Sequence, residues 1–223
     1  MIAPLTGRSR TVTAYHEAAH AIVGMAANFY PGQFVELDPG DRPDCLGIHR
    51  VIRRSWNWEQ PYQRMEIAVG GFLVDAAGWL AERRLFTVTG WDQGDGGGFS
   101  DYDDEDGNPA WDQFYDSEWL GQTDPTDAVE WLNKAAATMG LSAPTKAMHR
   151  DIEAAAADMV IVCWSGIEDL ARELDKTGKV EDLSRYWSQG SIGTVERLCG
   201  KWARRFAHRH PEARELCAEW RAA

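Results

Sequence analysis

Residues 11–27 read TVTAYHEAAHAIVGMAA, and this stretch decides how the rest of the chain is interpreted. Its apolar side chains recur at helical spacing, and they are Tyr15, Ala18, Ala19, Ile22 and Val23. A threonine hydroxyl can accept a hydrogen bond from the free amides of a first helical turn. We therefore predict a helix that begins with Thr11 or Thr13 as its N-cap and ends near Ala27.

Inside that helix stands the pentapeptide His16-Glu17-Ala18-Ala19-His20. Because His16 and His20 are one turn apart, both imidazoles face the same side and can reach one metal ion. Two imidazoles, a third protein ligand and an open position for water are typical of a catalytic Zn²⁺ site. Zinc lowers the pKa of its bound water toward about 7, and Glu17 is placed to take the proton as general base. The alternative is an ordinary helix that carries two surface histidines.

The segments that follow predict a mainly helical chain with one hairpin. Two strand-like runs, 33–37 and 45–52, flank the turn-rich residues 38–41, which favours an antiparallel pair. A second helix is predicted for 61–85. Its Gly70-Gly71 pair lies in mid-helix, where glycine costs about 1 kcal/mol per residue, so another backbone or a site is expected to approach closely there.

Three further helices are predicted after an acidic stretch. Residues 89–118 contain ten acidic side chains and no Lys or Arg, and we interpret them as a solvated loop or insertion. The run DYDDEDG within them misses the EF-hand pattern, so no calcium loop is predicted. The helices themselves are expected from Asp124 or Pro125 to 139, from 143 to 174, and from 192 to 223.

Composition restricts the class of protein. The 223 residues carry a formal net charge of −12, which argues against a nucleic-acid partner because phosphate binding needs a basic face. No run approaches 18 apolar residues, so no membrane span is expected. The first ten residues, MIAPLTGRSR, lack the apolar run of a signal peptide. Four widely spaced cysteines indicate reduced thiols, and a cytoplasmic location follows as an expectation.

The order of the motifs resembles a known family. AYHEAAHAIVG, residues 14–24, is similar to the zinc-site helix of the FtsH-type ATP-dependent metallopeptidases. QFVELDPGDRPDCLGIHRV (33–51) resembles that family's hairpin, and EIAVGGFLVDAAGWL (66–80) resembles its central helix. GQTDPTDAVEWLNKAAATMG (121–140) resembles the family segment Gly-x-x-x-Asp-x-x-x-Ala, with a gap one residue shorter. The likeness is good over residues 11–140 and looser over 141–190.

The resemblance implies a ligand set. In the family the Asp of the last segment is the third zinc ligand, which corresponds here to Asp124, with Ala128 four residues on. Asp127 is the alternative, because it lies just inside the same helix start. Either residue could instead serve only as a cap, Asp124 at the N-cap and Asp127 as the acid of a capping box.

Departures from the family limit what is carried over. The chain has no G-x-x-x-x-G-K-[ST] phosphate loop, and Ala19 replaces the usual Gly of the zinc motif. The resemblance is therefore to the peptidase domain without the AAA ATPase module. A homo-oligomer or a separate ATPase partner remains open.

The sequence thus predicts a mainly α, helical zincin-like metallopeptidase domain with a small β-hairpin and a helical C-terminal extension. Residues 1–140 would form the peptidase core, with the acidic insertion at 89–118, and residues 141–223 would pack on it. The expected activity is that of a zinc metalloendopeptidase acting on polypeptides, with His16, His20 and Asp124 on Zn²⁺ and Glu17 catalytic. The alternative is a catalytically idle, peptidase-like binding or regulatory domain.

Overall fold

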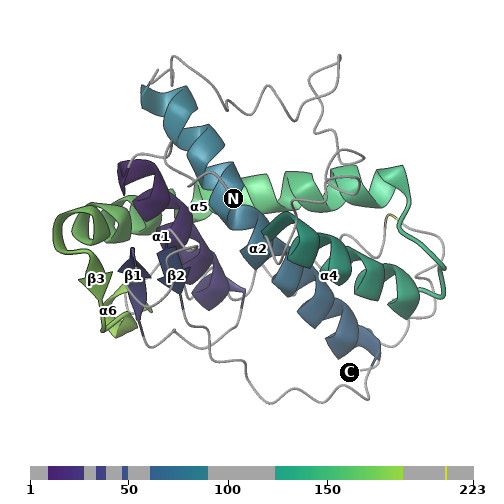
Figure 1. Ribbon diagram of the computed structural model, residues 1–223. Helices are drawn as coiled ribbons and strands as arrows, with labels where there is room; N and C mark the ends of the chain where they lie inside the picture. Colours follow the sequence, from purple (N-terminus) through teal and green to yellow (C-terminus); the bar gives the residue numbers. More distant parts are fainter. Residues whose placement is uncertain are drawn as a thin grey trace, which may run out of the picture.

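A computed structural model of the protein describes residues 10–27, 34–38, 47–49, 61–89 and 124–187, together with Arg209 (Figure 1). Its elements are α1 (Arg10–Ala26), β1 (Val35–Leu37), β2 (Gly47–His49), α2 (Pro61–Thr89), α4 (Asp124–Thr138), α5 (Lys146–Thr177), β3 (Lys179–Val180) and α6 (Ser184–Trp187). This part of the chain is mainly helical with one small sheet, as predicted. The acidic stretch beyond Thr89, the calcium-loop run and the predicted helix 192–223 lie outside the described residues, except for Arg209.

Helix α1 is enclosed on nearly all sides. Every residue from Val12 to Ala26 is buried, because the helix packs against α2, α5 and the sheet. Alanine and glycine make up much of its surface, which lets the neighbouring backbones approach closely. The sequence pattern identified one apolar stripe, whereas the fold covers the opposite face as well.

Helix α2 connects the two sides of the molecule. It packs against α1, α4 and α5, and Figure 1 shows it running between α1 with the sheet on one side and α4 on the other. On α4, Trp131 lies against Gly71, while Ala137 and Thr138 lie near Arg64 and Ala68. Later residues of α4 therefore lie beside earlier residues of α2, so the two helices run antiparallel.

The sheet has the strand order β2-β1-β3. Strands β1 and β2 pair antiparallel with Val35 opposite His49 and Leu37 opposite Gly47, which confirms the predicted hairpin. The third strand was not predicted. It follows α5 directly and pairs with β1 through Val35 and Val180, so the sheet connects the end of α5 to the hairpin.

The observed ends of the helices differ in part from the predicted ones. Helix α5 begins after Thr145, whose hydroxyl accepts from the amide of Met148 at 3.2 Å, and not at residue 143 as predicted. It ends at Gly178, where a positive φ of 79° suits glycine. Helix α4 begins at Asp124 as predicted, and α2 continues past 85 to Thr89.

The predicted N-caps of the first helix are wrong. Helix α1 already includes Arg10, so Thr11 and Thr13 lie within its first turns. The hydroxyl of Thr11 donates instead to Oδ2 of Asp175 at 3.1 Å, and Nε of Arg10 donates to the backbone oxygen of Asp175 at 2.9 Å. A tertiary contact to the last turn of α5 therefore holds the start of α1.

One hydrophobic core extends through all the main elements. It includes side chains of α1, β1, α2, α4 and α5. None of the described helices combines the length and the apolar character that a bilayer crossing requires.

Gly71 tests the packing of α4 on α2. A Cβ at this position would overlap the indole of Trp131, so Gly71→Ala should lower the free energy of unfolding by about 1–3 kcal/mol, as overpacking does. Gly166→Ala is the matched control: its Cβ would meet Ile22 at an ordinary 3.5 Å and should stabilise α5 by up to about 1 kcal/mol. Urea unfolding followed by circular dichroism measures both. A Gly71→Ala protein as stable as the control would contradict this packing.

Candidate metal centre

The two histidines of the motif are brought together in the interior. His16 is 8% exposed and His20 2%, and their Nε2 atoms lie 3.0 Å apart. The interpretation of an ordinary helix with two surface histidines is therefore wrong. The rings meet at 75° with centroids 4.6 Å apart, so the nitrogens, and not the ring faces, make the close contact.

Each ring is held at its other nitrogen by a group of α2. Nδ1 of His16 lies 2.5 Å from Oε1 of Glu82, a carboxylate that is itself 3% exposed. Nδ1 of His20 lies 2.7 Å from the carbonyl oxygen of Val74. A carbonyl oxygen only accepts, so His20 must donate from Nδ1, and the carboxylate of Glu82 favours the same tautomer for His16.

These partners leave two lone pairs facing each other. A neutral imidazole that carries its proton on Nδ1 has an unprotonated Nε2, and here both Nε2 atoms converge at 3.0 Å in the interior. Two such lone pairs repel unless a cation, a metal ion or a single shared proton, lies between them. Engaging Nδ1 of a ligand histidine with a carboxylate or a backbone carbonyl is also the usual outer-shell arrangement of metal sites.

The space beside the two nitrogens exists because residue 78 is glycine. A Cβ on Gly78 would lie 2.5 Å from Nε2 of His20 and 2.6 Å from Nε2 of His16. Two imidazole nitrogens around tetrahedral Zn²⁺ are about 3.3 Å apart when each bond is about 2.0–2.1 Å. The rings need to part by only a few tenths of an ångström, so the residues present fit a metal ion.

Glu17 follows His16 in the chain, and its side chain lies against Gly47 of the sheet. It is 8% exposed, and a Cβ on Gly47 of β2 would lie 2.7 Å from its Cδ and Oε1. The hairpin thus brings backbone, with no side chain, up to this carboxylate. A buried carboxylate that directly follows His16 in the chain is a candidate general base.

The described side chains do not complete a three-ligand group. Among them, no cluster of three His, Cys, Asp or Glu residues is arranged to hold a metal ion. Asp127 is exposed on α4. The side chains of Asp124 and His49 lie outside the described part, although their backbones belong to α4 and β2.

The sequence interpretation missed four contributors to this centre. Glu82, the carbonyl of Val74, Gly78 and Gly47 come from segments 27 or more positions away from the motif. Another backbone or a site was predicted to approach Gly70-Gly71. Helix α4 packs there through Trp131 at Gly71, whereas the histidines lie two turns further on, at Gly78. The sequence signal that could have pointed to this position is Gly78 followed four residues later by Glu82 on the same helix.

Cys163, the one cysteine among the described residues, does not contribute to this centre. Cys163 is free and buried on α5, and desolvation raises the pKa of its thiol to about 12. The thiolate that a nucleophile or a zinc ligand would need is therefore disfavoured at neutral pH.

Comparisons of the chain with protein-family models, curated proteins and solved structures find no match. The functional argument therefore depends on the motif and on the geometry of the centre.

Gly78 provides a direct test of the centre. Gly78→Ala would put a methyl group beside both Nε2 atoms, so we expect bound zinc to fall from stoichiometric to nearly none. Gly166→Ala, a helical glycine far from such crowding, should keep its metal. Zinc content after dialysis is measured by atomic absorption, with circular dichroism to check folding. Full zinc occupancy in a folded Gly78→Ala protein would rule out this position for the ion.

Proposed function

We propose that the protein is a zinc-dependent metallopeptidase that hydrolyses peptide bonds of polypeptides. The observation that carries the proposal is the pair of Nε2 atoms 3.0 Å apart, with both Nδ1 atoms engaged by acceptors. His16 and His20 would hold the ion. Zinc at this place would lower the pKa of a coordinated water and polarise the carbonyl of the scissile bond.

The chain's own groups supply the remaining steps. Glu17 takes a proton from the attacking water and passes it to the leaving amine, the role of a general base and then acid. Its carboxylate is held between α1 and Gly47 of β2, which limits its freedom. Glu82 and the carbonyl of Val74 orient His16 and His20 and keep their lone pairs directed at one point.

The helix register supports Asp124 as the third ligand. Trp131 lies at Gly71; because α2 and α4 are antiparallel, a step of seven residues along each helix brings Asp124 to the level of Gly78. Position 124 also precedes Ala128 by one turn and Trp131 by two, so it is on the same helix face as these two buried residues. Asp127, in contrast, is exposed.

Zinc affinity should rank the ligands. We expect one zinc per wild-type chain and its loss in His16→Ala. Asp124→Ala should weaken zinc binding by more than 100-fold, Glu82→Gln by the roughly 10–100-fold of an outer-shell partner, and Asp127→Ala hardly at all. Titration against a chelator measures the affinities. The reverse order of the two aspartates would move the assignment to Asp127. Zinc-free wild type, after supply of the metal, would favour a shared proton between the rings.

Glu17→Gln separates catalysis from metal binding. The amide keeps the shape of the side chain but lacks the basic oxygen, so zinc should stay bound while hydrolysis of an unfolded polypeptide falls by about 10²–10⁴-fold. A denatured, fluorescently labelled protein is the appropriate substrate, because it needs no unfolding step before cleavage.

Two results would contradict this mechanism. If wild type and Glu17→Gln both hold zinc and neither cleaves a broad panel of unfolded substrates, the idle binding domain becomes the better interpretation. If both cleave equally well, another group supplies the base.

A further inference from the structure

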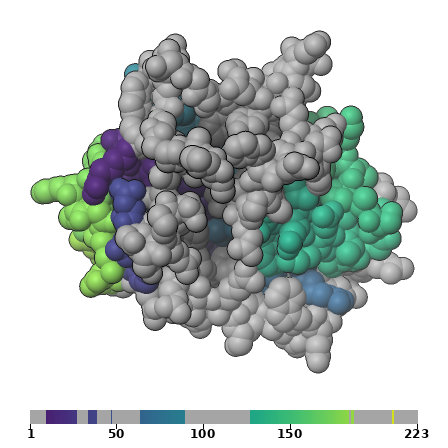
Figure 2. All heavy atoms as spheres, viewed as in Figure 1, coloured from purple at the N-terminus to yellow at the C-terminus, as the bar shows by residue number. Residues whose placement is uncertain are grey.

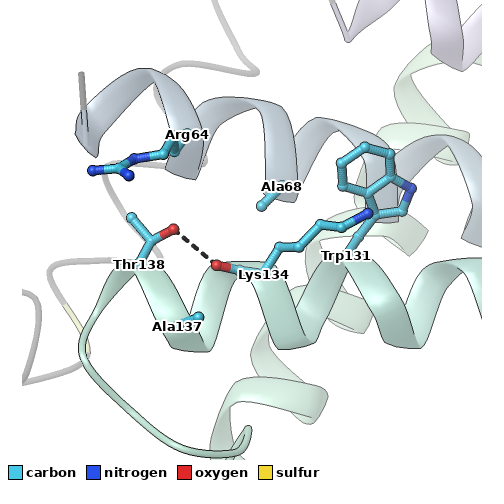
Figure 3. A pocket seen from close by; sticks show the side chains of 6 residues that line it. All are labelled: Arg64, Ala68, Trp131, Lys134, Ala137 and Thr138. Carbon is cyan, nitrogen blue, oxygen red and sulfur yellow. Dashed lines mark hydrogen bonds between the residues drawn. The ribbon is translucent and has the colours of Figure 1, made fainter. Parts of the chain in front are cut away.

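A groove of about 300 Å³ separates the first half of α2 from the second half of α4. It is lined by six residues (Figure 3), and they are Arg64, Ala68, Trp131, Lys134, Ala137 and Thr138. Figure 2 shows the beginning of α2 and helix α4 beside each other at the surface of the molecule. The groove is separate from the histidine pair, and the proposed chemistry does not use it.

Both charged residues of the groove are basic, although the chain carries a net charge of −12. Arg64 is exposed and forms no ion pair with any part of the chain that the structure describes. Lys134 is half exposed, and its Nζ lies 4.0 Å from the ring centroid of Trp131 and 3.6 Å from Oε2 of Glu130. Two cations on facing helices attract an anion more strongly than either does alone.

Between the two cations the groove is lined by two alanines and by a tryptophan whose ring is held in place. Ala68 on α2 and Ala137 on α4 line the groove with small side chains (Figure 3). Trp131 is 6% exposed, and its indole is fixed against Gly71. Figure 3 also shows the guanidinium of Arg64 and the ammonium of Lys134 directed toward opposite ends. This shape suits separated carboxylates along a peptide better than one compact anion.

We propose that this groove binds an acidic segment of the polypeptide substrate, with Arg64 and Lys134 each pairing with a carboxylate. The inference depends on the proposed peptidase function for its substrate and deepens it by naming the substrate class. The protein would therefore prefer unfolded polypeptides that carry Asp or Glu at a set distance from the scissile bond.

The helix sets that distance. Arg64, Gly71 and Gly78 follow one another at intervals of seven residues, so they share one face of α2. Arg64 precedes Gly78 by 14 residues, a length of about 21 Å along the helix. An extended peptide covers this length with about six residues. The acidic residue that pairs with Arg64 is accordingly expected about six positions from the bond that is cut, and the one that pairs with Lys134 at a different position.

Direct binding tests the groove independently of catalysis. The probe is a fluorescein-labelled, flexible peptide with two glutamates, compared with the same peptide carrying glutamines. Fluorescence anisotropy is recorded with the full-length, zinc-loaded Glu17→Gln protein, so that the probe is not cleaved. We expect the glutamate peptide to bind about 3- to 10-fold more tightly at low salt, the range for two exposed ion pairs.

The variant Arg64→Gln/Lys134→Gln should lose this preference. Lys146→Gln removes an exposed lysine from the start of α5 and is the matched control that should keep it. Circular dichroism confirms that each variant is folded. A preference that persists in the double variant, or no preference in the starting protein, overturns the proposal. Displacement of the probe by inorganic phosphate, but not by sodium chloride of equal ionic strength, would indicate a compact anion and also overturn it.

Cleavage by the protein with Glu17 intact distinguishes the two proposals. The glutamate preference should appear there as a lower KM, and Arg64→Gln/Lys134→Gln should raise KM with kcat unchanged. Selective binding of the acidic probe without any hydrolysis would contradict the peptidase function and leave the groove as a peptide site. Hydrolysis without a preference for acidic residues would contradict the groove and leave the peptidase function.

Discussion

The contact between two imidazoles of α1 and the backbone of α2 at Gly78 determines how these helices pack. The rings occupy the space that a side chain at residue 78 would fill, and hydrogen bonds at Nδ1 attach each ring to α2. Polar groups in a protein interior are costly unless they are satisfied. Here the satisfying partners, Glu82 and the carbonyl of Val74, also fix the ring orientations. The same contacts between α1 and α2 therefore determine both the packing of the helices and the orientation of the two rings.

A second glycine, seven residues earlier on α2, also makes room for a large side chain of a neighbouring helix. Gly71 admits the indole of Trp131 as Gly78 admits the histidines, and the two glycines share a face because seven residues make almost two full turns. The contact of Trp131 with Gly71 fixes which residues of α4 lie beside which residues of α2. The proposed third ligand at one end of α4 and the basic groove at the other both follow from that alignment.

The centre combines burial with charge in a way that a merely structural helix pair would not need. Glu17 and Glu82 are both carboxylates with less than a tenth of their surface exposed; Glu82 contacts His16, and Glu17 is the next residue of the motif. Replacing such a cluster by apolar side chains often preserves or increases stability. The proposed role in metal binding and proton transfer would account for these groups in the interior.

The sequence by itself determined the local elements and the motif. Helical spacing predicted α1, α2, α4 and α5, turn residues predicted the β1–β2 hairpin, and one-turn spacing predicted that His16 and His20 would share a face. These properties depend on neighbours within a few residues, which a linear pattern records. The N-caps of α1 were mispredicted because its start is held by Asp175, 164 positions from Thr11.

Only the tertiary structure decided which groups surround the motif. Glu82 lies 66 positions from His16, and Val74 lies 54 from His20; periodicity indicates that a face is buried but does not identify its partner. The third strand and the basic groove likewise arise where segments far apart in the chain meet. Which residues of two helices lie beside each other depends on where a glycine leaves space for a large side chain of the neighbouring helix. The linear pattern does not contain this long-range register.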